Sequence, residues 1–74
     1  MLVYNAITYS RHAEQRMRIR GLSRQDVELA LRIGDGFPED DGTYVYELDR
    51  IRVVIVERGA VAHVVTVIKM RKHA

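Results

Sequence analysis

The sequence contains no cysteine, and none of its apolar runs is long. Without cysteine the chain has neither a disulfide framework nor a thiolate-held metal, so packing and association with a partner must stabilise it. A membrane span needs about 20 consecutive apolar residues, which no segment supplies. At 74 residues the chain has room for one hydrophobic core. We therefore expect a single domain over residues 1–74 that lies in the cytoplasm and does not enter a membrane.

A metal-binding arrangement of side chains is lacking as well. The three histidines are scattered along the chain and show no ligand spacing. The acidic run from Glu39 to Asp41 has the composition of a solvated loop rather than of a cation site. We therefore expect neither a metal nor a cofactor.

The net charge is small, at +2, but it is unevenly distributed along the sequence. Residues 1–34 carry six arginines and three acids, residues 35–49 carry six acids and no base, and residues 50–74 carry six bases and one acid. A fold that keeps these segments apart has one basic and one acidic region on its surface. Such a surface is compatible with nucleic-acid binding.

Two helices are predicted in the first half of the chain. Ser10 is a suitable N-cap for a helix that runs to Arg20, and Gly21 is suited to end it in a left-handed conformation. Ser23 and Asp26 form a capping box for a second helix, whose apolar arc of about 200° predicts that it is largely buried. The short connection between the helices predicts a helical hairpin.

Strands are predicted on either side of this hairpin. Residues 2–8 form a short strand by composition, and residues 35–42, with two glycines, one proline and four acids, have the composition of a loop. Three strands follow at residues 43–48, 51–57 and 61–70, and their short connections require antiparallel pairing. The prediction is an α+β domain of order β-α-α-β-β-β, with the helical hairpin packed on a mainly antiparallel sheet.

The central predicted strand has apolar residues on both of its faces. Ile51, Val53 and Ile55 share one face, whereas Val54 and Val56 lie on the other. One helical hairpin can cover only one face of the sheet. We therefore expect a homodimer or a protein partner to cover the second face, unless it remains as an open cleft.

His12, Arg16 and Arg20 form a stripe along the first predicted helix. At about 100° per residue these three positions fall within an arc of about 80°. Ile19 flanks the stripe on one side, and Ala13 and Met17 flank it on the other. This pattern places the three basic side chains near the middle of the apolar side of the helix, where buried guanidinium groups need an anionic partner.

Three interpretations of this stripe are open. In the structural one, the arginines pair with carboxylates of the protein such as Asp35 or Glu47. In the second, the stripe binds an RNA phosphate through bidentate guanidinium contacts. In the third, it catalyses metal-free RNA cleavage, in which histidine transfers protons and arginine stabilises the charge on phosphorus.

The pattern H-x3-R-x3-R-G-L-S-x-x-D-V-x-x-A-L, from His12 to Leu31, resembles a widespread bacterial group known as domain-of-unknown-function family 4258. That group is distantly similar to the RelE and ParE toxins of toxin–antitoxin systems, several of which cleave mRNA. The resemblance implies a RelE-like fold with the element order given above. It does not by itself imply cleavage, because one fold hosts many functions.

Further candidate site residues lie in the predicted strands. His63 would pair with Ile55 in a simple hairpin, and it is either a packed structural residue or a second proton-transfer group. Tyr44 and Tyr46 share one strand face, so they either stack an unpaired base or belong to the core or an interface. Lys69 and Arg71 are candidate phosphate contacts in the basic C-terminal segment.

Together with the resemblance, which implies a RelE-like, toxin-type module with an antitoxin protein as a possible partner, these residues predict a domain that acts on RNA as a metal-independent endoribonuclease. Its candidate catalytic residues are His12, Arg16, Arg20 and His63, and its candidate RNA-binding residues are Arg16, Arg20, Tyr44, Tyr46, Lys69 and Arg71. The alternative is a non-catalytic domain whose stripe and open sheet face bind another protein.

Overall fold

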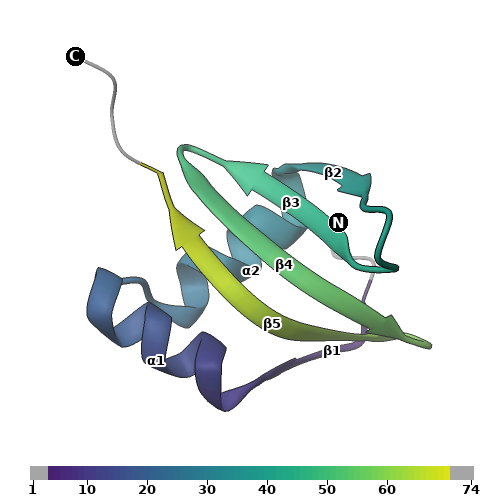
Figure 1. Cartoon of the computed structure of the whole chain (residues 1–74), viewed down its shortest axis with the longest axis horizontal. Helices are drawn as coiled ribbons and strands as arrows, with labels where there is room; N and C mark the ends of the chain where they lie inside the picture. Colours follow the sequence, from purple (N-terminus) through teal and green to yellow (C-terminus); the bar gives the residue numbers. More distant parts are fainter. Residues whose placement is uncertain (1–3, 71–74) are drawn as a thin grey trace.

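A computed structural model describes residues 4–70 and consists of two helices packed on one face of a five-stranded sheet (Figure 1). The fold is α+β, as predicted. The sheet order is β1-β5-β4-β3-β2, in which β1 runs parallel to β5 and all other pairs are antiparallel. The elements are β1 (Ala6–Tyr9), α1 (Arg11–Arg20), α2 (Arg24–Ile33), β2 (Asp35–Pro38), β3 (Tyr44–Leu48), β4 (Ile51–Arg58) and β5 (Val61–Lys69).

The helix boundaries are those predicted from local signals. The Ser10 side chain accepts a hydrogen bond from Ala13 N at the start of α1, and Gly21 ends this helix at φ 68°. Ser23 and Asp26 form the reciprocal capping box of α2. These contacts involve residues close together in the sequence, so the ends of both helices are specified locally.

The segment predicted as a loop over residues 35–42 contains a fifth strand. β2 pairs antiparallel with β3 through residues 35–38 and forms one edge of the sheet. Proline is tolerated in an edge strand because the backbone groups on the outer side of such a strand make no hydrogen bonds to a neighbouring strand. Gly36 has a specific role here, because a Cβ atom at this position would lie 2.6 Å from the ring of Tyr46.

The register of the β4–β5 hairpin differs by one residue from the prediction. The turn consists of Gly59 and Ala60 alone, because Arg58 pairs with Val61, and His63 therefore pairs with Val56 instead of Ile55. A shift of one residue moves a side chain to the other face of a sheet. His63 consequently lies on the face away from the helices.

The core lies between the helices and the central strands. α1 contributes Ala13 and Met17, and α2 contributes Val27, Ala30 and Leu31. The prediction that α2 is largely buried was wrong in part, because Leu29 and Ile33 are 46% and 61% exposed. Only one side of α2 contacts the sheet, and the apolar arc of α2 is wider than this contact. The buried strand residues facing these helices are Val53, Ile55, Ala62, Val64 and Val67.

The face of the sheet away from the helices carries no secondary structure element of the described chain. By the strand register, Val45, Val54 and Val56 lie on it, and Phe37 and Ile68 there are 38% and 43% exposed. Association of this face with a second chain remains a prediction. Neither described helix is long and apolar enough to cross a membrane.

Candidate anion-binding site between α1 and β5

Ser10 positions α1 against β5. Its backbone N–H donates to Val64 O at 2.9 Å, and its hydroxyl donates to Val65 O at 2.8 Å. The same hydroxyl caps α1 by accepting from Ala13 N at 3.0 Å. One residue therefore ends the pairing of β1 with β5 and directs α1 along the remaining part of β5, from Thr66 to Lys69.

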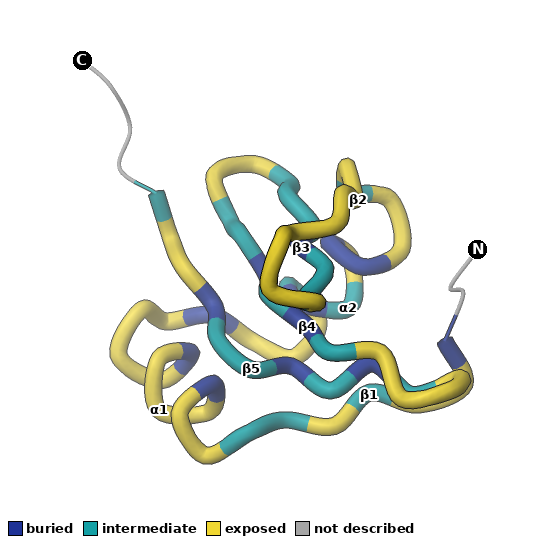
Figure 2. Tube along the Cα trace, turned by 45° about the vertical axis from the view of Figure 1, so that its right-hand side comes forward, coloured by how far each residue is buried: buried dark blue, intermediate teal, exposed yellow. Residues whose placement is uncertain are grey.

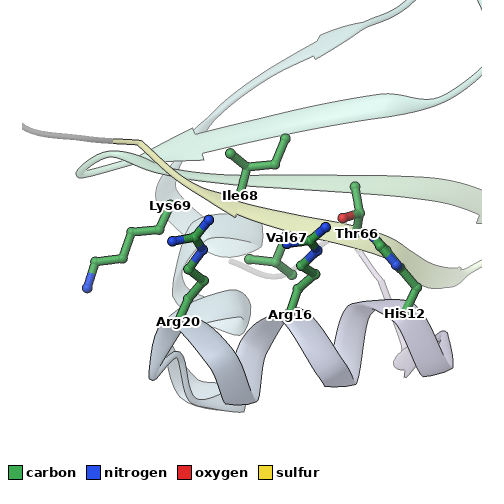
Figure 3. A pocket seen from close by; sticks show the side chains of 7 residues that line it. All are labelled: His12, Arg16, Arg20, Thr66, Val67, Ile68 and Lys69. Carbon is green, nitrogen blue, oxygen red and sulfur yellow. The ribbon is translucent and has the colours of Figure 1, made fainter.

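His12, Arg16 and Arg20 extend from the same side of α1 toward this part of β5 (Figure 3). They line a groove of about 180 Å³ whose other wall is formed by Thr66, Val67, Ile68 and Lys69. Val67 closes the base of the groove, since its side chain points toward α1 and is 1% exposed. The side chains of Thr66 and Ile68 point away from α1, so these residues contribute mainly their backbone to the wall.

The stripe does not lie in the middle of the buried side of α1, as the sequence predicted. Ala13 and Met17 alone are buried on this helix, and Ile19 is 67% exposed. Figure 2 shows that most of α1 is exposed. The three stripe residues lie beside the Ala13–Met17 line, in contact with solvent, because the sheet meets a narrower part of the helix than its apolar residues span.

The groove carries positive charge without a compensating acid. Two guanidinium groups, one ammonium group and one imidazole line it, and none of the described lining residues is acidic. Within residues 4–70, neither Arg16 nor Arg20 forms an ion pair. Like charges held side by side in this way repel one another, so an anion that enters the groove relieves that repulsion.

Three other arginines have carboxylate partners, whereas Arg11, Arg18, Arg50 and Arg58 form no ion pair within residues 4–70. Arg24 pairs with Glu14 at 3.4 Å, and Arg32 pairs with Glu28 at 3.2 Å.

The structural interpretation of the stripe, in which Arg16 or Arg20 forms a buried ion pair with Asp35 or Glu47, was wrong. Glu47 instead pairs with Arg52 across the β3–β4 ladder. Asp35 lies opposite Glu47 on the strand β2, at the other edge of the sheet. No polar or charged residue is fully buried among residues 4–70, so the arginines have no desolvation cost to recover.

Of the remaining predicted site residues that the structure describes, Lys69 lines the groove and the others do not. His63 lies on the other face of the sheet, where its Nδ1 is 2.8 Å from Thr8 Oγ1. Tyr44 and Tyr46 pack against the core on the helix side, with ring centroids 5.5 Å apart. Arg71 lies outside the described residues.

The stripe was recognisable from helical periodicity, but the β5 wall was not. β1 pairs only with Val61–Val64. The outer edge of β5 after Val64 therefore has no strand partner in the described chain, and Thr66 to Lys69 line a groove there. A parallel pairing of this kind has no local sequence signal.

A second polar cluster, also missed from the sequence, joins the start of the described chain to β3 and β4. Tyr4 donates a hydrogen bond from its hydroxyl to Glu57 Oε2 at 2.6 Å, and its oxygen is 2.9 Å from that of Tyr46. Burial of the ring, together with these hydrogen bonds, raises the pKa of Tyr4 far above its ordinary value. The polar atoms of this cluster hydrogen-bond with one another, so we assign the cluster a role in stability.

No group of three acidic or histidine side chains within the described part of the chain is arranged to hold a metal ion. The side chains that line the groove offer charge and hydrogen bonds from Arg16, Arg20 and Lys69, and proton transfer from His12. Chemically, the groove is suited to a phosphate or another anion with several acceptor oxygens.

Comparison with known proteins gives one result. No curated protein and no solved structure matches this chain. The family model described as "Domain of unknown function (DUF4258)" matches residues 9–72, which include both helices and all of the strands from β2 to β5. The chain therefore belongs to the DUF4258 family.

Proposed function

We propose that this domain binds single-stranded RNA through its phosphate groups, in the groove between α1 and β5. The observation that carries the proposal is the alignment of Arg16, Arg20 and Lys69 around a groove whose described lining contains no acid. Phosphate contacts by guanidinium and ammonium groups supply most of the affinity of proteins for nucleic acid.

The spacing of the stripe suits consecutive phosphates. Residues four apart on a helix are separated by about 6 Å along its axis, which is similar to the separation of neighbouring phosphates in a nucleotide strand. Arg16 and Arg20 are therefore positioned to hold two successive phosphates. His12, one turn before Arg16, is in place to contact a 2′-hydroxyl, the group that distinguishes RNA from DNA.

The described lining of the groove offers no large aromatic ring for reading bases. It contains no tyrosine or phenylalanine on which a base could stack. Tyr44 and Tyr46, the predicted stacking residues, belong to the helix side of β3. We therefore expect recognition of the backbone with little sequence preference and strong dependence on salt.

We also propose a catalytic form of this function, in which the bound RNA is cleaved without a metal. His12 removes the proton of the 2′-hydroxyl, whose oxygen attacks the adjacent phosphorus and displaces the 5′-oxygen, giving a 2′,3′-cyclic phosphate. Arg16 and Arg20 stabilise the negative charge on the phosphorane. Because His63 lies on the other face of the sheet, the leaving oxygen takes its proton from water or from protonated His12.

The assignment to RNA also draws on the distant similarity to the RelE and ParE toxins that the resemblance to the DUF4258 group implies. The same proposal includes a RelE-like relationship. It also includes an antitoxin protein that blocks the groove. The alternative function, binding of another protein by the sheet face that carries Phe37 and Ile68, is favoured by the exposure of these two apolar side chains.

Binding is tested with a fluorescent oligouridylate and its anisotropy. Arg16→Ala combined with Arg20→Ala is expected to weaken binding about a hundredfold, at about tenfold for each lost charge-assisted contact. The matched control combines Arg32→Ala with Arg52→Ala, which removes the same net charge from residues paired elsewhere. Equal losses in the two double variants would mean that RNA responds to net charge alone, and the groove would be excluded.

Cleavage is tested in EDTA with the same RNA and with a substrate that lacks the 2′-hydroxyl. The expected result is slow cleavage of RNA alone, abolished in His12→Ala and retained in His63→Ala. Cleavage that requires an added metal, or that continues at the same rate in His12→Ala, contradicts the mechanism. Binding without cleavage would leave a phosphate-binding domain that is not an enzyme.

A further inference from the structure

The two edges of the sheet differ in how they are protected against pairing with another strand. β2, at one edge, has the sequence Asp-Gly-Phe-Pro, in which a charge, a glycine and a proline all disfavour the addition of a strand. β1, at the other edge, has the sequence Ala-Ile-Thr-Tyr, which has none of these and is rich in residues favoured in strands. The outer edge of β1 has no strand partner within the described residues.

The free backbone groups of β1 belong to Ile7 and Tyr9. Ser10 N donates to Val64 O, so the residue after β1 directs its N–H toward β5. Backbone groups alternate in direction along a strand, and those of Ile7 and Tyr9 therefore point away from β5. Both residues are half-buried, and their side chains pack against the core.

A hollow of about 330 Å³ lies beside this edge. It is lined by Asn5, Ala6, Ile7 and Tyr9 on the strand side and by Arg24 and Glu28 of α2. The guanidinium carbon of Arg24 lies 5.1 Å from the centroid of the Tyr9 ring, at the C-terminal end of β1. Glu28 lies one helical turn further along α2. The hollow therefore has a mixed floor, in which Ala6 and Ile7 lie beside the polar Asn5, and one charge of each sign on its wall.

We propose that β1 pairs antiparallel with β1 of a second copy of this chain, around a two-fold axis. Two such strands place Ile7 of one copy near Tyr9 of the other, so each outward backbone group finds a partner. A two-fold interface uses the same surface on both subunits and must be complementary to itself. The axis reverses the order of the charges on α2, which brings Arg24 of one copy beside Glu28 of the other.

The charges of this wall are available for such an exchange. Arg24 and Glu14 are 72% and 48% exposed, and Glu28 and Arg32 are similarly accessible. Exposed pairs of this kind contribute little to stability. Replacing them with pairs across the dimer therefore costs little, while the dimer gains backbone hydrogen bonds and buries the floor of the hollow.

This inference does not rest on RNA binding, because none of the residues of the α1–β5 groove takes part in it. The variants that test the dimer, at positions 7, 24 and 28, lie outside that groove. Sedimentation equilibrium of the protein alone measures association without a nucleic acid. Each of the two proposals can therefore fail while the other stands.

The backbone contact is tested with Ile7→Pro, compared with Ile7→Val as the matched control. Proline removes an N–H that points away from β5, and it fits an edge strand whose other side is unchanged. Since each dimer contains the position twice, we expect the dissociation constant of the dimer to rise about a hundredfold in Ile7→Pro. Ile7→Val keeps the donor and should dimerise like the wild type.

The charge contact is tested by exchange and does not depend on whether Ile7→Pro folds. Arg24→Glu alone and Glu28→Arg alone place like charges together and are expected to weaken the dimer about tenfold each. Both changes together restore opposite charges across the axis and should recover most of the affinity. The fold of every variant is checked by circular dichroism.

Two results would overturn the proposal. One is a wild-type protein that remains a monomer throughout the micromolar range. The other is a dimer that is unaffected by Ile7→Pro and by both charge reversals but is broken by Val56→Lys. This second result would assign the contact to the sheet face that carries Val54 and Val56.

Discussion

Two polar clusters lie at opposite ends of the β4–β5 hairpin, and they differ in how their polar groups are satisfied. Tyr4, Glu57 and Tyr46 hydrogen-bond with one another near the turn of the hairpin. At the far end, Arg16 and Arg20 line the groove beside β5 with no carboxylate partner in the described chain. The polar groups of the first cluster are satisfied within the protein, whereas no described carboxylate pairs with the arginines of the second.

This difference predicts that substitutions in the two clusters have different effects on stability. Removing a member of the Tyr4 cluster leaves a hydrogen-bonding group without its partner, so stability should fall. Removing a cation from the groove leaves nothing stranded and relieves repulsion between like charges, so stability should be maintained or increase. The comparison can be tested by substitutions in each cluster.

The largest effect on stability is expected for Tyr4→Phe. The Tyr4 ring is 5% exposed, and its hydroxyl contacts both Glu57 and Tyr46. Loss of these hydrogen bonds should lower the free energy of unfolding by about 1–2 kcal/mol. Urea denaturation of the wild type and the variant measures this difference, and an unchanged midpoint would show that the cluster contributes nothing.

The same cluster predicts a loss of stability in alkali. The pKa of Tyr4 is raised in the folded protein, chiefly by burial, so the folded state retains a proton that the unfolded chain releases near pH 10. The contribution of Tyr4 is therefore fully present below about pH 10 and declines above it. Urea denaturation on either side of that pH should show a steeper decline for the wild type than for Tyr4→Phe; parallel declines would contradict the prediction.

A smaller difference is expected between paired and groove arginines. Arg52→Ala breaks the half-buried contact with Glu47 and should cost roughly 0.5–1 kcal/mol of stability. Arg16→Ala and Arg20→Ala should each change stability by less than about 0.5 kcal/mol, or raise it slightly. Thermal melts of the three variants provide the comparison. A loss of about 3 kcal/mol or more in a groove variant would indicate a buried ion pair.

The features that were predictable from the sequence depend on neighbours along the chain. Ser10, Gly21 and the Ser23–Asp26 capping box all act within a few residues, and they fixed both helices. The three main strands followed from apolar runs separated by short turns. Periodicity also identified the stripe, because angular positions on a helix depend on residue numbers alone.

The features that were missed depend on contacts between distant segments. β2 has the composition of a loop, and it is a strand because β3 supplies the ladder and Gly36 admits the Tyr46 ring. His63 changed face because the β4–β5 turn is one residue shorter than expected. The exposure of the stripe depended on where β5 meets α1, and helical periodicity contains no information about that position.

The central claim is that phosphate binds in the groove between α1 and β5. The most direct measurement is the change in backbone amide chemical shifts when oligouridylate is added to the isotope-labelled protein. We expect the largest changes at residues 11–20 and 66–69, and we expect them to be lost in the Arg16→Ala, Arg20→Ala double variant. Changes concentrated on β2 and β3, or no changes at RNA concentrations that saturate the anisotropy signal, would contradict the claim.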